Sequence, residues 1–144
     1  MFNKLLLALD LSPDADHLLN RVSKICCDDM EKVHVVHVIK SGMHELYRTP
    51  VDWERNLDLR ELRDHTVYRL GEILRRNGFS VSAENIYVRA GEPANEIKKL
   101  AHELGADLVI VGSHCKKEGW LDLPGATTNC VLQGIDSDVM AVRV

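Results

Sequence analysis

The residues whose types best suit chemistry follow the fourth apolar segment of the chain. Gly112-Ser113-His114-Cys115 offers a hydroxyl, an imidazole and a thiol in consecutive positions, and these are the groups of nucleophilic catalysis. No carboxylate that would orient the imidazole is identifiable, and neighbouring loop residues seldom present both groups to one substrate atom. We therefore expect a loop here and no catalytic site. Cys115 has a second interpretation as a redox-sensitive thiol, because His114, Lys116 and Lys117 beside it favour the thiolate.

The remaining histidines and cysteines are not spaced as metal ligands. His34 and His37 lie three residues apart in a predicted strand, hence on opposite faces of it. Cys26 and Cys27 are adjacent, and no C-x-x-C or H-E-x-x-H spacing occurs anywhere in the chain. The sequence therefore predicts no metal site and no disulfide framework, and Cys26 is expected in the core.

Length and charge limit the classes of protein to consider. A chain of 144 residues suits one domain, which we place at 1–144. The 18 Lys and Arg against 22 Asp and Glu give a net charge of -4, which argues against nucleic acid as a partner. The apolar run Leu5–Leu9 is too short to cross a membrane and lacks a cleavage signature. We expect a cytoplasmic protein that binds neither nucleic acid nor membrane.

Strand-like and helix-like segments alternate along the chain. The predicted strands are Lys4–Leu9, Val33–Ile39, Val81–Val88, Asp107–Val111 and Val139–Val144. The predicted helices begin near Pro13, Trp53, Pro93 and Gly125. This alternation predicts an α/β fold, a doubly wound, five-stranded parallel sheet with helices on both faces, in which the polar 81–88 strand lies at an edge.

The helix signals are specific enough to test. Ser12 is expected to cap the first helix, with Pro13 at its first position. The residues predicted to face the core are Leu18, Leu19, Val22, Ile25 and Cys26 in the first helix and Leu62, Leu70, Ile73 and Leu74 in the second. Ligands of such sheets bind beyond the carboxyl ends of the strands, which draws attention to Asp10, Ile39 and Gly112.

Three segments of this sequence resemble the universal stress protein family. They are KLLLALDLSPDA (4–15), VHVVHVI (33–39) and GEPANEIKKLAHELGADLVIVGSH (91–114). The resemblance covers essentially the whole chain, and it implies the strand order 3-2-1-4-5 of a Rossmann-like fold similar to the adenine nucleotide alpha hydrolases. It also implies a homodimer paired through the fifth strands, here through Val139, Met140, Ala141, Val142 and Arg143. Such pairing would cover an apolar edge strand.

The resemblance also suggests how to test for ATP. ATP-binding members of the family carry G-x2-G-x9-G-[ST] after the fourth strand. Gly112 and Gly125 match the first and third positions, but Cys115 and Ala126 replace the second glycine and the hydroxyl residue. A non-glycine residue in a left-handed backbone costs about 1–2 kcal/mol, and a lost hydrogen bond to a charged group costs about 1.5–3 kcal/mol. Together these changes weaken ATP binding by about 100-fold or more.

Other residues of the chain match contacts that ATP-binding relatives make. An acidic residue at Asp10 would lie near the nucleotide, and Val38 or Ile39 would contact adenine, although turn capping and core packing explain the same residues. The candidate nucleotide contacts are Asp10, Val38, Ile39, Gly112, His114, Cys115, Lys116, Gly125, Ala126 and Thr127. Of these, Lys116 and Thr127, together with Lys117, could compensate for the departures from the pattern.

The sequence thus predicts a homodimeric stress-resistance protein that acts by binding or signalling, without turnover, without a cofactor and without tight ATP binding. The alternative is a member of the family that binds ATP and hydrolyses it slowly through the degenerate loop. A redox sensor acting through Cys115 is the third interpretation.

Overall fold

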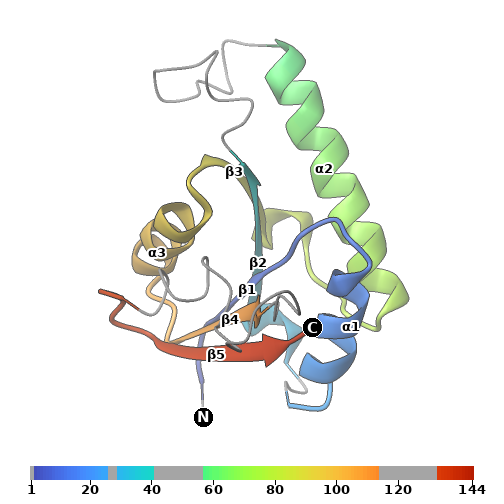
Figure 1. The fold of residues 1–144 in the computed structure, drawn as a ribbon. Helices are drawn as coiled ribbons and strands as arrows, with labels where there is room; N and C mark the ends of the chain where they lie inside the picture. The colour runs from blue at the N-terminus through green and yellow to red at the C-terminus, as the bar shows by residue number, and fades with distance from the viewer. Residues whose placement is uncertain (1, 26–28, 41–56, 114–132) are drawn as a thin grey trace, which may run out of the picture.

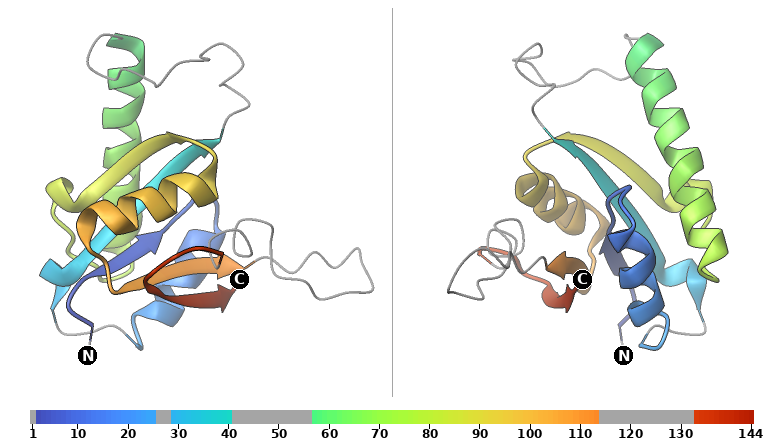
Figure 2. Two further views of the ribbon diagram at one scale, coloured as in Figure 1. Left: turned by 90° about the vertical axis from the view of Figure 1, so that its left-hand side faces the viewer. Right: turned by 45° about the vertical axis from the view of Figure 1, so that its right-hand side comes forward.

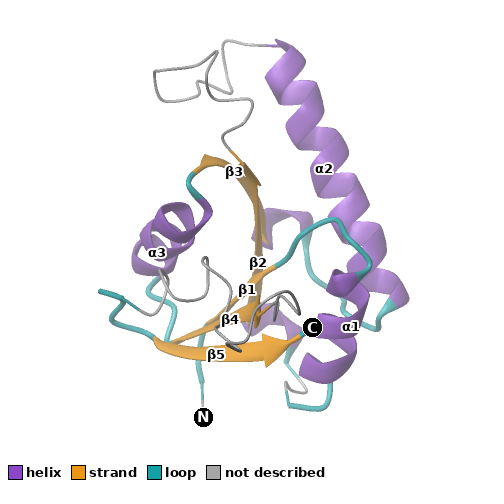
Figure 3. Ribbon diagram, viewed as in Figure 1, coloured by secondary structure: helices purple, strands orange, loops and turns teal. Residues whose placement is uncertain are grey.

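The computed structural model describes residues 2–25, 29–40, 57–113 and 133–144, and all statements below concern these residues. Figure 3 separates them from the remaining segments, which are drawn in grey. The predicted helix at 125–134, the segment that links the second strand to the second helix, Cys26 and Cys115 fall wholly or largely outside the described residues.

Five parallel strands form one sheet. They are β1 (Leu5–Ala8), β2 (Val33–Lys40), β3 (Ile86–Gly91), β4 (Leu108–Ser113) and β5 (Asp138–Arg143). Their order is β3-β2-β1-β4-β5, with every neighbouring pair parallel. The strand order reverses between β1 and β4, as predicted, so a crevice is expected at the carboxyl ends of the central strands.

Helices cover both faces of the sheet, which confirms the doubly wound architecture (Figures 1 and 2). The helices α1 (Asp14–Val22) and α2 (Leu57–Arg76) cover one face, and α3 (Pro93–Leu104) covers the other. Side chains of the central strands alternate between the two faces. Leu5 and Leu7 of β1 pack with α1 and α2, whereas Leu6 packs with α3.

The first helix is shorter than predicted at both ends. It begins at Asp14, so the N-cap position is occupied by Pro13 and not by the predicted Ser12, which lies one residue further out and whose Oγ accepts from the Asp14 N–H at 3.2 Å. It ends at Val22: the Ser23 N–H still bonds the Leu19 carbonyl, but the bond from the Ile25 N–H to the Val22 carbonyl spans only three residues and forms a turn. The predicted core position Ile25 is therefore wrong: this side chain lies beyond the helix and is 56% exposed.

The third strand begins later than predicted. The expected start at Val81 is wrong, because a 3-10 turn at Ala83–Asn85 precedes the strand, with the N–H of Asn85 donating to the Ser82 carbonyl. Val81 still packs against the core, but from a loop. The strand pairs only with β2 among the described strands, so the prediction of an edge position is confirmed.

The second helix presents its predicted residues to the sheet. Leu70, Ile73 and Leu74 are buried, and Leu62 is half-buried. Arg76 at its last turn makes a bidentate ion pair with Asp16 of α1, at 2.8 and 2.6 Å. This guanidinium, with the amide of Asn77, holds the pKa of Asp16 below its usual range.

The amino ends of β1 and β4 are joined by Asp107. Its carboxylate accepts hydrogen bonds from the backbone N–H groups of Asn3 (2.7 Å) and Lys4 (2.8 Å). Its own N–H donates to the Lys4 carbonyl at 2.9 Å. Because the two N–H groups bond the ionised carboxylate, the pKa of Asp107 lies below its usual range. The amino end of the central strand pair is therefore closed.

Candidate functional site

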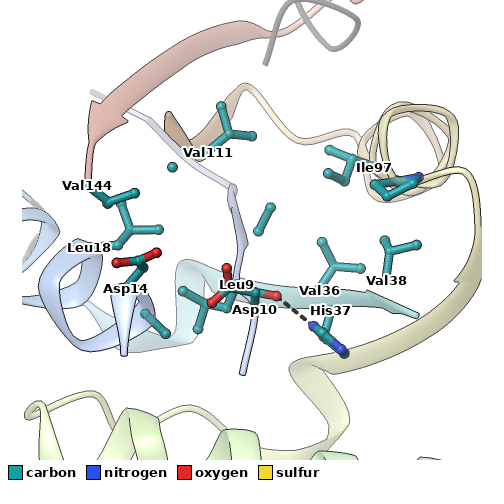
Figure 4. Close-up of a pocket in the computed structure, with 14 residues that line it drawn as sticks. Leu9, Asp10, Asp14, Leu18, Val36, His37, Val38, Ile97, Val111 and Val144 are labelled. Atoms are coloured by element: carbon teal, nitrogen blue, oxygen red, sulfur yellow. Dashed lines mark hydrogen bonds between the residues drawn. The ribbon is translucent and has the colours of Figure 1, made fainter. Parts of the chain in front are cut away.

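A cavity of about 160 Å³ opens at the carboxyl ends of β1, β2 and β4 (Figure 4). It lies at the reversal of strand order, and the first turns of α1 and α3 contribute to its walls. Its lining residues are Ala8, Leu9, Asp10, Asp14, Ala15, Leu18, Val36, His37, Val38, Pro93, Ile97, Val111, Gly112 and Val144.

One side of the cavity is apolar. In Figure 4, Val36, Val38 and Ile97 lie together on this side, with Val111 above them. These residues come from β2, α3 and β4. An apolar cavity of about 150 Å³ accepts a benzene-sized molecule. The cavity as a whole, at about 160 Å³, therefore has room for about one flat aromatic ring.

The other side of the cavity carries carboxylates. Asp10 follows β1, and its Oδ1 accepts hydrogen bonds from the backbone N–H (3.0 Å) and the hydroxyl (2.6 Å) of Ser12. The turn-capping role considered for Asp10 is thus confirmed, and the same side chain also lines the cavity. Asp14 lines it from the start of α1. The described lining residues include no lysine or arginine, so the charged side chains of this part are two carboxylates.

His37 lies where β1 and β2 separate. The N–H of Leu9 donates to the Val36 carbonyl at 2.9 Å, the last backbone bond between the two strands. The Leu9 carbonyl lies 2.9 Å from Nδ1 of His37, which therefore donates to it (Figure 4). The side chain of His37 thus takes part in shaping the crevice.

Gly112 leaves space at the mouth of the cavity. A Cβ placed on it would meet the Val144 side chain at 3.4 Å and Leu18 at 3.8 Å, and its φ is not positive. The fold therefore accommodates a small side chain here without backbone strain. Val144 reaches this place because its N–H donates to the Ser113 carbonyl (3.1 Å), which continues the pairing of β5 with β4.

The structure brings Asp10, Val38 and Gly112 together, as the sequence predicted. Ile39, offered as the alternative to Val38, is not among the lining residues: its side chain packs against the core that α1 and α2 cover, on the face opposite to Val38. The other candidate contacts lie outside the described residues; they are His114, Cys115, Lys116, Gly125, Ala126 and Thr127.

Sequence reasoning missed several lining residues that come from the ends of other elements. They are Asp14, Ala15, Leu18, Pro93, Ile97, Val111 and Val144. The starts of α1 and α3 carry a signal that could have found some of them, since helices that follow β1 and β3 begin at the same edge of the sheet as the cavity. For Val144 the sequence contains no comparable signal.

β5 forms an edge of the sheet, and all five predicted dimer residues belong to it. It pairs with β4 alone among the described strands. Val142 is buried, Val139 and Met140 are half-buried against the two cores, and Ala141 and Arg143 are exposed. The strand is therefore apolar towards both layers of helices, and no described strand pairs with its outer side.

The described residues contain neither a metal cluster nor a membrane-spanning helix. No group of three or more His, Cys, Asp or Glu side chains among them is arranged to hold a metal ion. No helix in the described part of the chain has the length and apolarity that a membrane span requires.

Comparison with known sequences identifies the family. The sequence model of the universal stress protein family matches residues 1–143. The chain belongs to the universal stress protein family. The universal stress protein A homolog 2 of Coxiella burnetii is 28% identical over 145 residues, which cover 99% of this chain and 96% of the relative. A universal stress protein of Methanocaldococcus jannaschii is also 28% identical, with 99% and 96% covered.

Solved structures agree with this assignment. That of the Methanocaldococcus jannaschii protein superposes with a TM-score of 0.68 at 26% identity, covering 100% of this chain and 98% of the other. A universal stress protein in complex with cAMP has a TM-score of 0.60 at 19% identity, with 99% and 97% covered. The universal stress protein of Archaeoglobus fulgidus in complex with dAMP has a TM-score of 0.56 at 16% identity, with 96% of each chain covered. The last two likenesses show the common fold.

Proposed function

We propose that this universal stress protein is a cytoplasmic stress-resistance protein that acts by binding, without turnover, and that its cavity takes the nucleoside part of an adenine nucleotide. The observation that carries the proposal is the cavity at the carboxyl ends of β1, β2 and β4, with an apolar side and a carboxylate at Asp10. We do not expect the protein to bind ATP tightly.

The two sides of the cavity suit the two parts of a nucleoside. A purine ring gains from contact with the apolar side formed by Val36, Val38 and Ile97, because burying apolar surface is favourable. Ribose hydroxyls are donors, and the Asp10 carboxylate, which lines the cavity, is an acceptor. The complexes of two structural neighbours with cAMP and dAMP support the same ligand class.

We expect the phosphate groups of a nucleotide to contribute less binding free energy in this cavity than the nucleoside does. The described lining supplies the carboxylates of Asp10 and Asp14 and no basic side chain that would attract phosphate. The loop that follows carries Cys115 and Ala126 where ATP-binding relatives have a glycine and a hydroxyl residue. We therefore expect the affinity for Mg-ATP to exceed that for adenosine by no more than about tenfold, which is about 1.4 kcal/mol.

The spacing between Gly112 and Gly125 favours the opposite interpretation, an ATP-binding member that hydrolyses ATP slowly. In that case the triphosphate would supply most of the binding energy. Mg-ATP would then bind about 100-fold or more tightly than adenosine.

Calorimetry with adenosine, AMP and Mg-ATP, and with guanosine as the control, decides between the two. We expect the three adenine compounds to bind within about tenfold of one another and guanosine to bind more weakly. Thermal unfolding gives an independent check, since a ligand at 100 times its dissociation constant adds about 2.7 kcal/mol of stability. Tight binding of Mg-ATP alone, with phosphate release, would establish the alternative, and failure of every adenine compound to bind would refute the proposal.

We also propose that two copies pair through β5. The N–H groups of Asp138 and Val144 donate to the carbonyls of Asp107, just before β4, and of Ser113 at its end, and backbone groups alternate in direction along a strand. The N–H groups of residues 139, 141 and 143 therefore point to the outer side, where a second β5 would accept or donate. This pairing would remove an exposed edge.

A proline at an outward position tests this pairing, because it removes a donor while the bonds to β4 remain. We expect Ala141→Pro to be a monomer in sedimentation at a concentration where the wild-type protein is a dimer. Ala141→Thr keeps the N–H and suits a strand, so it should remain dimeric. A dimeric Ala141→Pro protein, or a monomeric wild-type protein, would refute pairing through β5.

A further inference from the structure

His37 occupies the point at which the ladder between β1 and β2 stops. In a continued parallel ladder, the Leu9 carbonyl would accept the backbone N–H of Val38, two residues beyond the Val36 carbonyl that accepts from Leu9. The structure has no such backbone bond, and the Nδ1 of His37 takes the Leu9 carbonyl instead, at 2.9 Å. The strands can thus separate while the half-buried carbonyl keeps a donor.

This bond determines the tautomer of the ring. A carbonyl oxygen only accepts, so Nδ1 of His37 carries the proton, and Nε2 of the neutral ring is an acceptor. Protonation of Nε2 would leave the donor at Nδ1 in place. The bond to Leu9 is therefore compatible with both charge states of the ring.

The peptide that His37 holds is the one that leads into Asp10. The Leu9 carbonyl belongs to the peptide unit that includes the N–H of Asp10, so fixing this carbonyl fixes the direction in which the chain enters residue 10. On the other side, the Asp10 carboxylate is held by the N–H and hydroxyl of Ser12. Asp10 thus sits between two anchors, one of which is the side chain of the neighbouring strand.

We propose that His37 is a positioning residue of the binding cavity, which uses its Nδ1–H to hold the Leu9–Asp10 peptide and so to aim the Asp10 carboxylate at the ligand. This inference rests on the proposed binding of adenosine in the cavity. It differs from a purely structural role because it assigns the effect to one nitrogen of the ring.

Two substitutions of His37 distinguish the role of Nδ1 from that of Nε2. In His37→Asn the amide nitrogen is bonded to Cγ, as Nδ1 is, so the donor to Leu9 is kept. In His37→Gln the amide nitrogen is placed farther from the backbone, near the position of Nε2, and the Leu9 carbonyl loses its donor. We expect calorimetry to show adenosine affinity within about threefold of wild type for His37→Asn and about tenfold weaker for His37→Gln, a difference set by one unsatisfied carbonyl.

A measurement without ligand keeps the test independent of the proposed function. Nitrogen chemical shifts of the wild-type ring should show the proton on Nδ1, and hydrogen exchange of the Ser12 amide should be faster in His37→Gln than in His37→Asn. If adenosine fails to bind the wild-type protein while these two signals appear, the proposed function fails and the positioning of Asp10 stands. A proton on Nε2, equal exchange in the two variants, or equal adenosine affinity in them would overturn the positioning role.

Discussion

The two ends of β1 use an aspartate in opposite ways. At the amino end, Asp107 takes the N–H groups of Asn3 and Lys4 and ties β1 to β4, leaving no opening between them. At the carboxyl end, Oδ1 of Asp10 accepts hydrogen bonds from Ser12 within its own turn, and the strands part around a cavity. The same chemical group closes one end of the strand pair and borders an opening at the other.

The two aspartates differ in how far along the sequence their hydrogen-bond partners lie. Asp107 bonds backbone groups 103 and 104 residues away, so its carboxylate is used for tertiary structure. Oδ1 of Asp10 accepts from Ser12, two positions away, and so holds the local turn. A carboxylate held in its turn at the border of a cavity is placed to meet a ligand. We therefore expect substitutions at the closed end to change stability and substitutions at the open end to change binding.

The largest expected effect on binding is at Asp10. Asp10→Asn keeps an acceptor for Ser12 but loses the charge, so we expect adenosine affinity to fall about tenfold, with little change in the free energy of unfolding. Asp10→Ala loses the turn bonds as well and should bind still more weakly, with a loss of up to about 1 kcal/mol of stability. Calorimetry and urea unfolding measure the two quantities. Unchanged affinity in both variants would remove Asp10 from the site.

A smaller effect is expected at Gly112. In Gly112→Ala the new methyl group meets Val144 and Leu18 at ordinary contact distances, so the fold should tolerate it. Because these two residues line the cavity, the methyl group narrows it, and we expect adenosine affinity to fall about threefold, or roughly 0.7 kcal/mol. Urea unfolding should show no loss of stability. A marked loss of stability would mean that the open end is packed as tightly as the closed end.

The smallest effect on binding is expected at Asp107, at the amino end of β1. There the quantity to measure is the pH dependence of stability. The pKa of Asp107, like that of Asp16, is lower in the folded protein than its ordinary value near 3.9, so the ionised form stabilises the fold above that pH. This stabilisation is lost as the pH falls below about 4 and through the lower folded pKa. Urea midpoints of the wild-type protein should fall over this range, and those of Asp107→Asn should depend less on pH. Adenosine affinity at neutral pH should be the same in both, and a loss of affinity in Asp107→Asn would break the contrast between the two ends.

Much of the fold follows from local patterns in the sequence. Continuous apolar runs such as Leu5–Leu9 indicate strands buried on both faces, and Gly105, with a φ of 66° after α3, ends that helix as the sequence suggests. Val81-Ser82-Ala83 also alternates in the manner of a strand, but local hydrogen bonds make a turn there. The strand order was implied by the family resemblance, since strand patterns do not specify which strands are neighbours.

The candidate site was less predictable because it depends on which face of a strand meets the cavity. Val38 and Ile39 are equally apolar and adjacent, and only the packing of α3 against one face shows that Val38 lines the cavity. In the sequence, the spacing of His37 from His34 serves only to argue against a metal site. The role of His37 next to Leu9 depends on a contact between strands that the spacing does not contain.

The central position of β1 in the sheet affects the order in which its two edges can pair while the chain is synthesised. This strand is made first, yet its second neighbour β4 begins at Leu108, about a hundred residues later. At about 5–20 residues per second, a growing chain exposes one edge of an apolar strand for about 5–20 s before that neighbour exists. Leu5–Leu9 is the kind of segment that pairs with other chains when its edge is open. The edge of the central strand that β4 covers is therefore the last of its two edges to be paired as the chain is made.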